Sequence, residues 1–133
     1  MRYPHSMALL EVLKFPDSRL RHKGKSVDSV TPELKKLAED MLETMYEEKG
    51  IGLAAIQVGQ DVRLLVIDIS PVGESRYDTE EDSLTDLEKA VKMPIVIFNP
   101  EITKKEGKTR YDEGCLSVPG FYESVERSKY IEV

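Results

Sequence analysis

The sequence is poor in cysteine and in long apolar runs, and acidic residues outnumber basic ones. A single cysteine excludes an intrachain disulfide and is typical of a reducing compartment, so we expect a cytoplasmic protein. No apolar run approaches the roughly 20 residues that cross a bilayer, and residues 7–10 are too short for the core of a signal peptide. The formal net charge of −6 argues against nucleic-acid and membrane partners.

What the sequence does contain fits one globular domain over residues 1–133, with 40% apolar and 33% charged residues. Apolar residues recur every three or four positions between residues 31 and 49, which predicts an amphipathic helix. Thr31 can cap its start, Pro32 suits its first position, and Gly50 can cap its end. The apolar stripe, which we expect in the core, consists of Leu34, Leu37, Ala38, Met41, Leu42 and Met45.

Two continuous apolar runs, residues 62–69 and 95–98, predict strands that are covered on both faces. Between them, residues 73–92 carry a local net charge of −4, from seven acids and three bases, and predict a surface insertion with a short helix at 83–91. Further strands are expected at residues 101–103, 108–112, 121–127 and 129–133, with a turn at 104–107 joining the first two. These patterns predict an α+β fold.

The only cysteine lies in the stretch Glu-Gly-Cys-Leu-Ser at residues 113–117, just before a Val-Pro-Gly turn. A lone cysteine is often a small buried apolar residue, but a glycine-rich turn beside an acid favours an accessible thiolate. Such a thiolate is either a nucleophile or a metal ligand. Upstream, residues 50–57 are small and apolar and end at Gln57, whose neutral amide we expect to be buried and paired.

Gly-Ile-Gly-Leu-Ala-Ala-Ile-Gln at residues 50–57, followed by Glu-Gly-Cys-Leu-Ser at 113–117, resembles the first two signature motifs of the peptide deformylase family. The resemblance extends from about residue 7 to residue 133 and includes Arg127, where the family usually has an arginine. The acidic segment 73–92 is longer than in compact family members. The resemblance implies a metal-dependent amidohydrolase that removes the formyl group from the N-terminal methionine of newly made polypeptides, with formyl-methionyl nascent chains at the ribosome as partners.

The resemblance also implies roles for particular residues. A divalent metal, natively Fe²⁺ and replaceable by Zn²⁺, Ni²⁺ or Co²⁺, would take Cys115 as its one sulfur ligand. Gln57 and the backbone N–H of Leu116 would face the oxyanion that forms when metal-bound hydroxide attacks the formyl carbon. A metal lowers the pKa of bound water from ~15.7 towards ~7, and each fixed donor contributes ~3 kcal/mol.

The substrate cleft, by the same resemblance, would be lined by three residues, which would pair the peptide backbone as a strand does. They are Ile51, Gly52 and Gly114. Glu113 would orient the cysteine loop.

The family's third motif, His-Glu-x-x-His on a helix, is absent from these 133 residues. The two histidines, His5 and His22, are not followed by glutamate or by a second histidine, and we expect both at the surface. The chain therefore carries one of three protein ligands and no general base. We expect antiparallel sheets around a central helix that is missing here, with the 31–49 helix outside.

Three interpretations follow from this absence. In the first, which we favour, the chain is the N-terminal portion of a deformylase, truncated before the C-terminal metal-binding helix and inactive alone. A C-terminal companion segment or a homodimer would then supply the missing part. In the second, the chain is a non-catalytic deformylase-like binding or interaction protein. The third, a cysteine-nucleophile hydrolase, lacks a base.

Overall fold

The computed structural model describes residues 9–70 and 90–133 and shows an α+β fold, as predicted. Every pairing between its strands is antiparallel. The predicted helix at 83–91 and most of the acidic segment 73–92 lie outside the described residues. In chain order the elements are η1 (Ser18–Arg21), α1 (Pro32–Glu47), β1 (Gly52–Ala54), η2 (Ala55–Val58), β2 (Leu64–Ile67), β3 (Ile95–Phe98), β4 (Lys104–Glu106), β5 (Thr109–Cys115), β6 (Val118–Arg127) and β7 (Tyr130–Glu132).

Helix α1 begins as its sequence predicts, because the Thr31 hydroxyl accepts a hydrogen bond from the Leu34 N–H at 3.2 Å. Its end differs from the prediction by one residue. Lys49, not Gly50, takes the left-handed conformation, with φ of 58°. The Gly50 N–H then bonds the Met45 carbonyl at 2.8 Å, closing a Schellman motif. No helix in the described ranges is long and apolar enough to cross a membrane.

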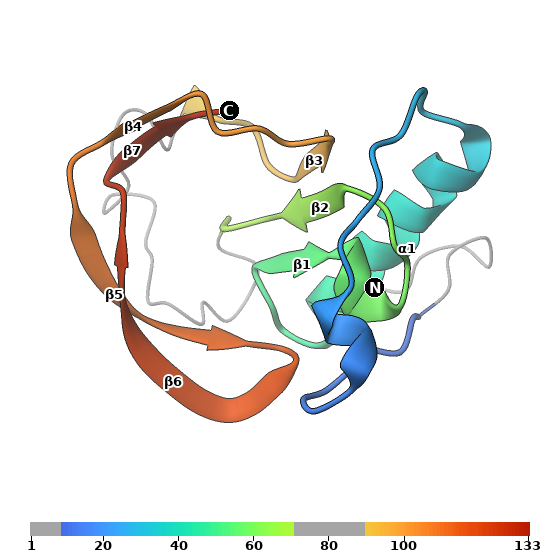
Figure 1. Ribbon diagram of the computed structural model, residues 1–133, viewed down its shortest axis with the longest axis horizontal. Coiled ribbons are helices and arrows are strands. Elements are labelled where there is room, and N and C mark those ends of the chain that lie inside the picture. The colour runs from blue at the N-terminus through green and yellow to red at the C-terminus, as the bar shows by residue number, and fades with distance from the viewer. Residues whose placement is uncertain (1–8, 71–89) are drawn as a thin grey trace.

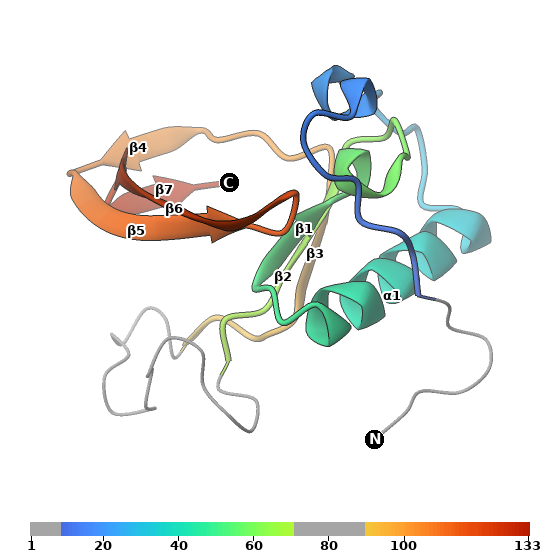
Figure 2. The same cartoon turned by 90° about the horizontal axis from the view of Figure 1, so that it is seen from below.

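The core lies between α1 and a three-stranded sheet of order β1-β2-β3, with α1 across one face of the sheet (Figure 2). Met41 and Met45 on the helix are fully buried, and Leu64 and Val66 from β2 pack with them. Strand β2 covers only Leu64–Ile67 and is shorter than the strand predicted at 62–69. Strand β3 has the predicted bounds, but it is not covered on both faces as predicted, since Val96 is exposed. Alternate residues of β2 are therefore fully buried against α1, and the others are half-buried on the opposite face.

The remaining strands form two separate two-stranded sheets that curve away from the core in Figure 1. The predicted hairpin between residues 101–103 and 108–112 is wrong. Residues 101–103 form no strand, and the predicted turn instead contains β4, which pairs with β7 near residue 133. Strand β5 pairs with β6 in one long hairpin whose turn is Leu116–Ser117, whereas residues 118–120, predicted as the turn, belong to β6. Strand β4 is short and charged, so its local pattern gives no sign of a distant partner.

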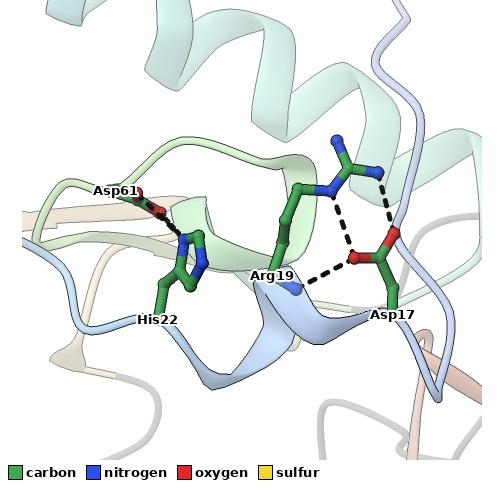
Figure 3. A network of polar contacts seen from close by, with 4 residues as sticks. All are labelled: Asp17, Arg19, His22 and Asp61. Carbon is green, nitrogen blue, oxygen red and sulfur yellow. Dashed lines mark hydrogen bonds and ion pairs between the residues drawn. The ribbon is translucent and has the colours of Figure 1, made fainter.

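The basic N-terminal segment is organised by the Asp17–Arg19 ion pair and by a contact between His22 and Asp61, shown in Figure 3. The Asp17 carboxylate accepts hydrogen bonds from the backbone and side chain of Arg19 and so caps η1. The hydrogen bond from the Arg19 side chain lowers the pKa of Asp17 to about 2. His22 lies 3.1 Å from the Asp61 carboxylate and is exposed, as predicted. His5 lies outside the described residues.

Candidate active site

Gln57 lies in η2, and its side-chain amide has a fixed orientation. Its Oε1 accepts a hydrogen bond from the Ala54 N–H at 2.9 Å, and only the oxygen of an amide can do so. Its Nε2 must therefore point the other way, where it lies 3.2 Å from Ser117 Oγ and 3.6 Å from Cys115 Sγ. The side chain is half-buried rather than buried, and it is paired at both ends, as predicted for its amide.

Cys115 is exposed at the end of β5, and its neighbour Leu116 joins the cysteine turn to the core. The Leu116 side chain packs against Gly50 so closely that a Cβ at Gly50 would lie 2.7 Å from Leu116 Cδ1. This close approach explains the glycine. The Leu116 N–H makes no hydrogen bond within the described part of the chain. The site thus holds a thiol and two N–H donors, one on the Gln57 side chain and one on the backbone.

Glu113 and Arg127 form a bidentate ion pair across the β5–β6 hairpin, with N–O distances of 2.8 Å and 2.7 Å. The hydrogen bond from Arg127 lowers the pKa of Glu113. Glu113 thus links its own strand to the far end of β6. Its expected role in orienting the cysteine loop remains a prediction, and Arg127 is the partner through which it would act.

The predicted cleft residues lie on two different strands. Gly52 is exposed on β1, which is an edge strand because its only partner among the described strands is β2. The carbonyl of Ile51 just before it accepts a hydrogen bond from the Asp68 N–H at 2.9 Å. Gly114 is exposed on β5, where the Tyr122 ring lies over it so that a Cβ would be 2.9 Å from Tyr122 Cε1. No hydrogen bond joins the two glycines to each other.

The structure adds residues to which the sequence assigned no role. The Ser117 hydroxyl is the nearer partner of the Gln57 amide, and Ser117 is only 4% exposed. Two backbone N–H groups of the N-terminal segment bond the same region, Leu13 to the Gln57 carbonyl at 2.7 Å and Phe15 to the Ser117 carbonyl at 2.8 Å. Ser117 lies in the second motif and could have been found there. The backbone contacts carry no sequence signal, because every residue except proline has an N–H.

A metal site is not complete within residues 9–70 and 90–133. These residues contain no cluster of three or more His, Cys, Asp or Glu side chains placed to hold an ion. Cys115 offers one sulfur ligand, whereas a tetrahedral catalytic site takes three protein ligands and an open position. His22 is paired with Asp61. The described residues alone therefore do not fit a metal ion.

Comparison with known proteins gives a consistent result. The family model for "Polypeptide deformylase" matches residues 9–133. The peptide deformylase of Alkalilimnicola ehrlichii is 44% identical over 125 residues, covering 94% of this chain and 61% of the relative. That of Nitrosococcus oceani is 46% identical over 127 residues, covering 96% and 65%.

Solved structures agree with this match. A peptide deformylase from Legionella pneumophila superposes with a TM-score of 0.73 at 40% identity, covering 93% of this chain and 63% of that one. A peptide deformylase from Ehrlichia chaffeensis in complex with actinonin superposes with a TM-score of 0.77 at 35% identity, covering 94% of this chain and 66% of that one. The chain thus spans less than two thirds of the length of these relatives.

Proposed function

This chain belongs to the polypeptide deformylase family, and from that premise we propose that it provides the oxyanion-binding and peptide-binding part of a formyl-methionine peptide amidohydrolase. The substrate would be a formyl-methionyl peptide, presented as a nascent chain at the ribosome in the cytoplasm. The observation that carries the proposal is the orientation of the Gln57 amide. Its Oε1 accepts a hydrogen bond from the Ala54 N–H, so its Nε2 must lie on the side of Cys115.

Two neutral donors would bind the charge that develops on the formyl oxygen, namely Gln57 Nε2 and the Leu116 N–H. Fixed donors stabilise such a charge without reorganising, an effect of about 3 kcal/mol for each donor in well-studied enzymes. The orientation of the amide supports this role, because Nε2 cannot turn away without breaking the bond to Ala54. The Leu116 N–H, which bonds no other described residue and lies in a turn whose Leu116 side chain packs on Gly50, supports the second donor.

The peptide would add to the open edge of β1. An exposed glycine at an edge strand lets another backbone approach and pair as an extra strand, and Gly52 is such a residue. The Ile51 carbonyl accepts a hydrogen bond from the N–H of Asp68, the residue after β2, which keeps this edge in place. Gly114 would meet the peptide from the β5 side through its exposed backbone, since its lack of a side chain is already used by the close approach of the Tyr122 ring.

We further propose Cys115 as one ligand of a divalent metal, Fe²⁺ natively and Zn²⁺, Ni²⁺ or Co²⁺ as replacements. The other ligands and the general base would come from outside the described residues, on a C-terminal companion segment that completes the domain or on a second copy of the chain. One thiolate holds a divalent ion weakly, so the chain alone should retain no metal through dialysis and should not deformylate peptides.

A fusion protein tests this proposal: this chain is joined to the part of a relative that it does not match. The 133-residue chain is assayed on a formyl-methionyl peptide alone, and then fused to the unmatched C-terminal part of the Alkalilimnicola ehrlichii relative. We expect activity and bound metal only in the fusion. There, Cys115→Ala should remove the metal and the activity together. Gln57→Ala should lower kcat by roughly a hundredfold and leave the metal in place.

Gln60→Ala is the matched control, because Gln60 is exposed on the same loop and its side chain makes no hydrogen bond among the described residues. Equal loss of metal in the Gln57 and Cys115 variants would show that the two roles are assigned wrongly. A fusion that binds metal and formyl-methionyl peptide without hydrolysing it would refute catalysis. The non-catalytic binding protein would then be the better description.

A further inference from the structure

The β5–β6 hairpin has few attachments to the rest of the protein. Its two strands pair only with each other within the described residues, and most of their side chains are exposed. The hairpin meets the core at its turn, Leu116–Ser117. The Leu116 side chain packs on the core there, and the Gln57 amide bonds Ser117. Because Cys115 lies next to this turn, its position relative to Gln57 depends on how the turn is held.

The N-terminal segment supplies a third attachment that reaches both motifs. The Leu13 N–H bonds the Gln57 carbonyl at 2.7 Å, and the Phe15 N–H bonds the Ser117 carbonyl at 2.8 Å. The two donors are two residues apart, and Phe15 begins a turn that the Asp17 N–H closes on the Lys14 carbonyl at 2.9 Å. Lys14 lies between them, exposed, and its N–H makes no hydrogen bond among the described residues.

This segment is itself firmly held. The Leu10 N–H bonds the hydroxyl of Thr44 in the middle of α1 at 2.9 Å, and Thr44 is 1% exposed. Val12 and Leu13 are both buried in the core. A backbone fixed in this way stays in place on the core when the hairpin moves.

These contacts form a closed ring of covalently linked and hydrogen-bonded groups. It runs from Leu13 to the Gln57 carbonyl, along Gln57 to Nε2, across to Ser117 Oγ, and from the Ser117 carbonyl back to Phe15. Without the Phe15 bond, the turn would keep, among the described residues, only its contacts with the Gln57 amide and through the Leu116 side chain. Ser117 and Cys115 could then move away from Nε2, which the bond to Ala54 holds in place.

We propose that the backbone of residues 13–15 is a clamp that holds the cysteine turn against the Gln57 amide, with Phe15 and Ser117 as positioning residues. The proposal rests on the proposed function for its catalytic consequence only. The clamp itself is a property of this chain, with or without activity.

The test compares Phe15→Pro, which removes the N–H, with Phe15→Ala, which keeps it. In ¹⁵N NMR spectra of the 133-residue chain, the Gln57 side-chain NH₂ is assigned by its loss in Gln57→Ala. We expect its resonances to move in Phe15→Pro towards those of the exposed Gln60, and to stay in Phe15→Ala. Hydrogen exchange at residues 114–117 should rise about tenfold in Phe15→Pro, the factor that ~1.4 kcal/mol of lost hydrogen bonding gives.

In the active fusion, Phe15→Pro should lower kcat at least about tenfold and leave KM within about twofold, since the clamp acts on the oxyanion donor and not on the peptide edge. An unmoved Gln57 resonance and unchanged exchange in folded Phe15→Pro would overturn the clamp, whatever the activity. Clamp signals in an inactive fusion would instead refute the proposed function alone.

Should Phe15→Pro fail to fold, hydrogen exchange in the unsubstituted chain decides. The Phe15 N–H must then exchange at the rate of the cysteine turn and much more slowly than its neighbour Lys14. Equal rates for Phe15 and Lys14 would overturn the proposal.

Discussion

The α1 side of the molecule and the β5–β6 hairpin are held by different forces. On α1, Met41 and Met45 are completely buried and pack on a three-stranded sheet. Only two of the seven residues of β5 and one of the ten residues of β6 are even half-buried. Apolar burial stabilises the first region, whereas a few directed contacts at one turn fix the second to it.

This difference separates stability from site geometry. A substitution in the core changes the free energy of unfolding of the whole chain, since that energy is concentrated there. A substitution at the turn can move Cys115 relative to Gln57 while the core stays folded. The four predictions that follow, from the largest expected effect to the smallest, test this separation.

Met45→Ala should lower the free energy of unfolding by about 2–5 kcal/mol, because it removes a fully buried side chain and leaves a cavity. Tyr111→Ala is the matched change in the hairpin, where the ring is 61% exposed, and should cost less than about 1 kcal/mol. Urea denaturation of both variants measures the two values. Similar losses would mean that the hairpin is as much a part of the core as α1.

Gly50→Ala should cost about 1–3 kcal/mol, because the new Cβ would lie 2.7 Å from Leu116 Cδ1 and must displace the Leu116 side chain from its packing on the core. Adding Leu116→Ala should restore part of the loss, with a coupling of about 0.5–3 kcal/mol in a double-mutant cycle. Gly52→Ala serves as control, since its Cβ would meet nothing closer than the Val66 carbonyl oxygen at 3.8 Å. Strict additivity of the Gly50 and Leu116 changes would contradict the packing described for the turn.

Arg127→Ala should cost at most about 1 kcal/mol at pH 7, since the Glu113–Arg127 pair is largely exposed. The pair depresses the folded-state pKa of Glu113 below its ordinary 4.5. Its stabilisation is therefore present above pH 4.5 and lost as the pH falls through the lowered pKa. Arg110→Ala, at an exposed arginine without an ion pair in the described chain, should show no such difference. Denaturation at pH 7 and pH 3 measures both variants.

Asp17→Asn should have the smallest effect, because the side chain lies at the surface and asparagine can still accept the Arg19 N–H. The substitution removes only the charge that pairs with the Arg19 side chain. As the folded pKa is about 2 against an ordinary 3.8, the advantage of the unsubstituted chain should exist above pH 3.8 and fade as the pH falls towards 2. Thermal midpoints from pH 6 to pH 2 measure it. An advantage that persists unchanged at pH 2 would rule out this charge as its source.

The sequence predicts the α1 side well because its signals are local. The stripe at helical spacing, the Thr31 cap and Pro32 all lie within the helix that they specify. The strand at 95–98 is likewise a short apolar run with the bounds predicted for it. The end of α1 shows where local signals stop being sufficient. Lys49 takes the backbone conformation that glycine favours, whereas Gly50 is a glycine because the side chain of Leu116, 66 positions further along, packs against it.

The sequence predicts the hairpin side less well, because its pairings are distant. Strand β4 consists of two lysines and a glutamate and finds its partner β7 near the end of the sequence. In the site, the two motifs indicate Gln57 and Cys115, and the structure brings them to 3.6 Å. Ser117 also lies in the second motif, but the fixed amide orientation and the bonds from Leu13 and Phe15 depend on tertiary structure, and no residue pattern encodes them.

The hydrogen bonds of Gln57 to Cys115 and Ser117 join residues 58 and 60 positions apart, and this separation bears on the order of folding events. Helix α1, β1 and β2 lie within residues 32–67 and can meet by closing short loops, whereas the site needs a long one, which costs more entropy and forms later. On a ribosome, the core of this chain can form while the cysteine turn is still unmade. Cys115 and its turn are then made after the core that carries Gln57, and native-state hydrogen exchange should find this turn opening before α1 does.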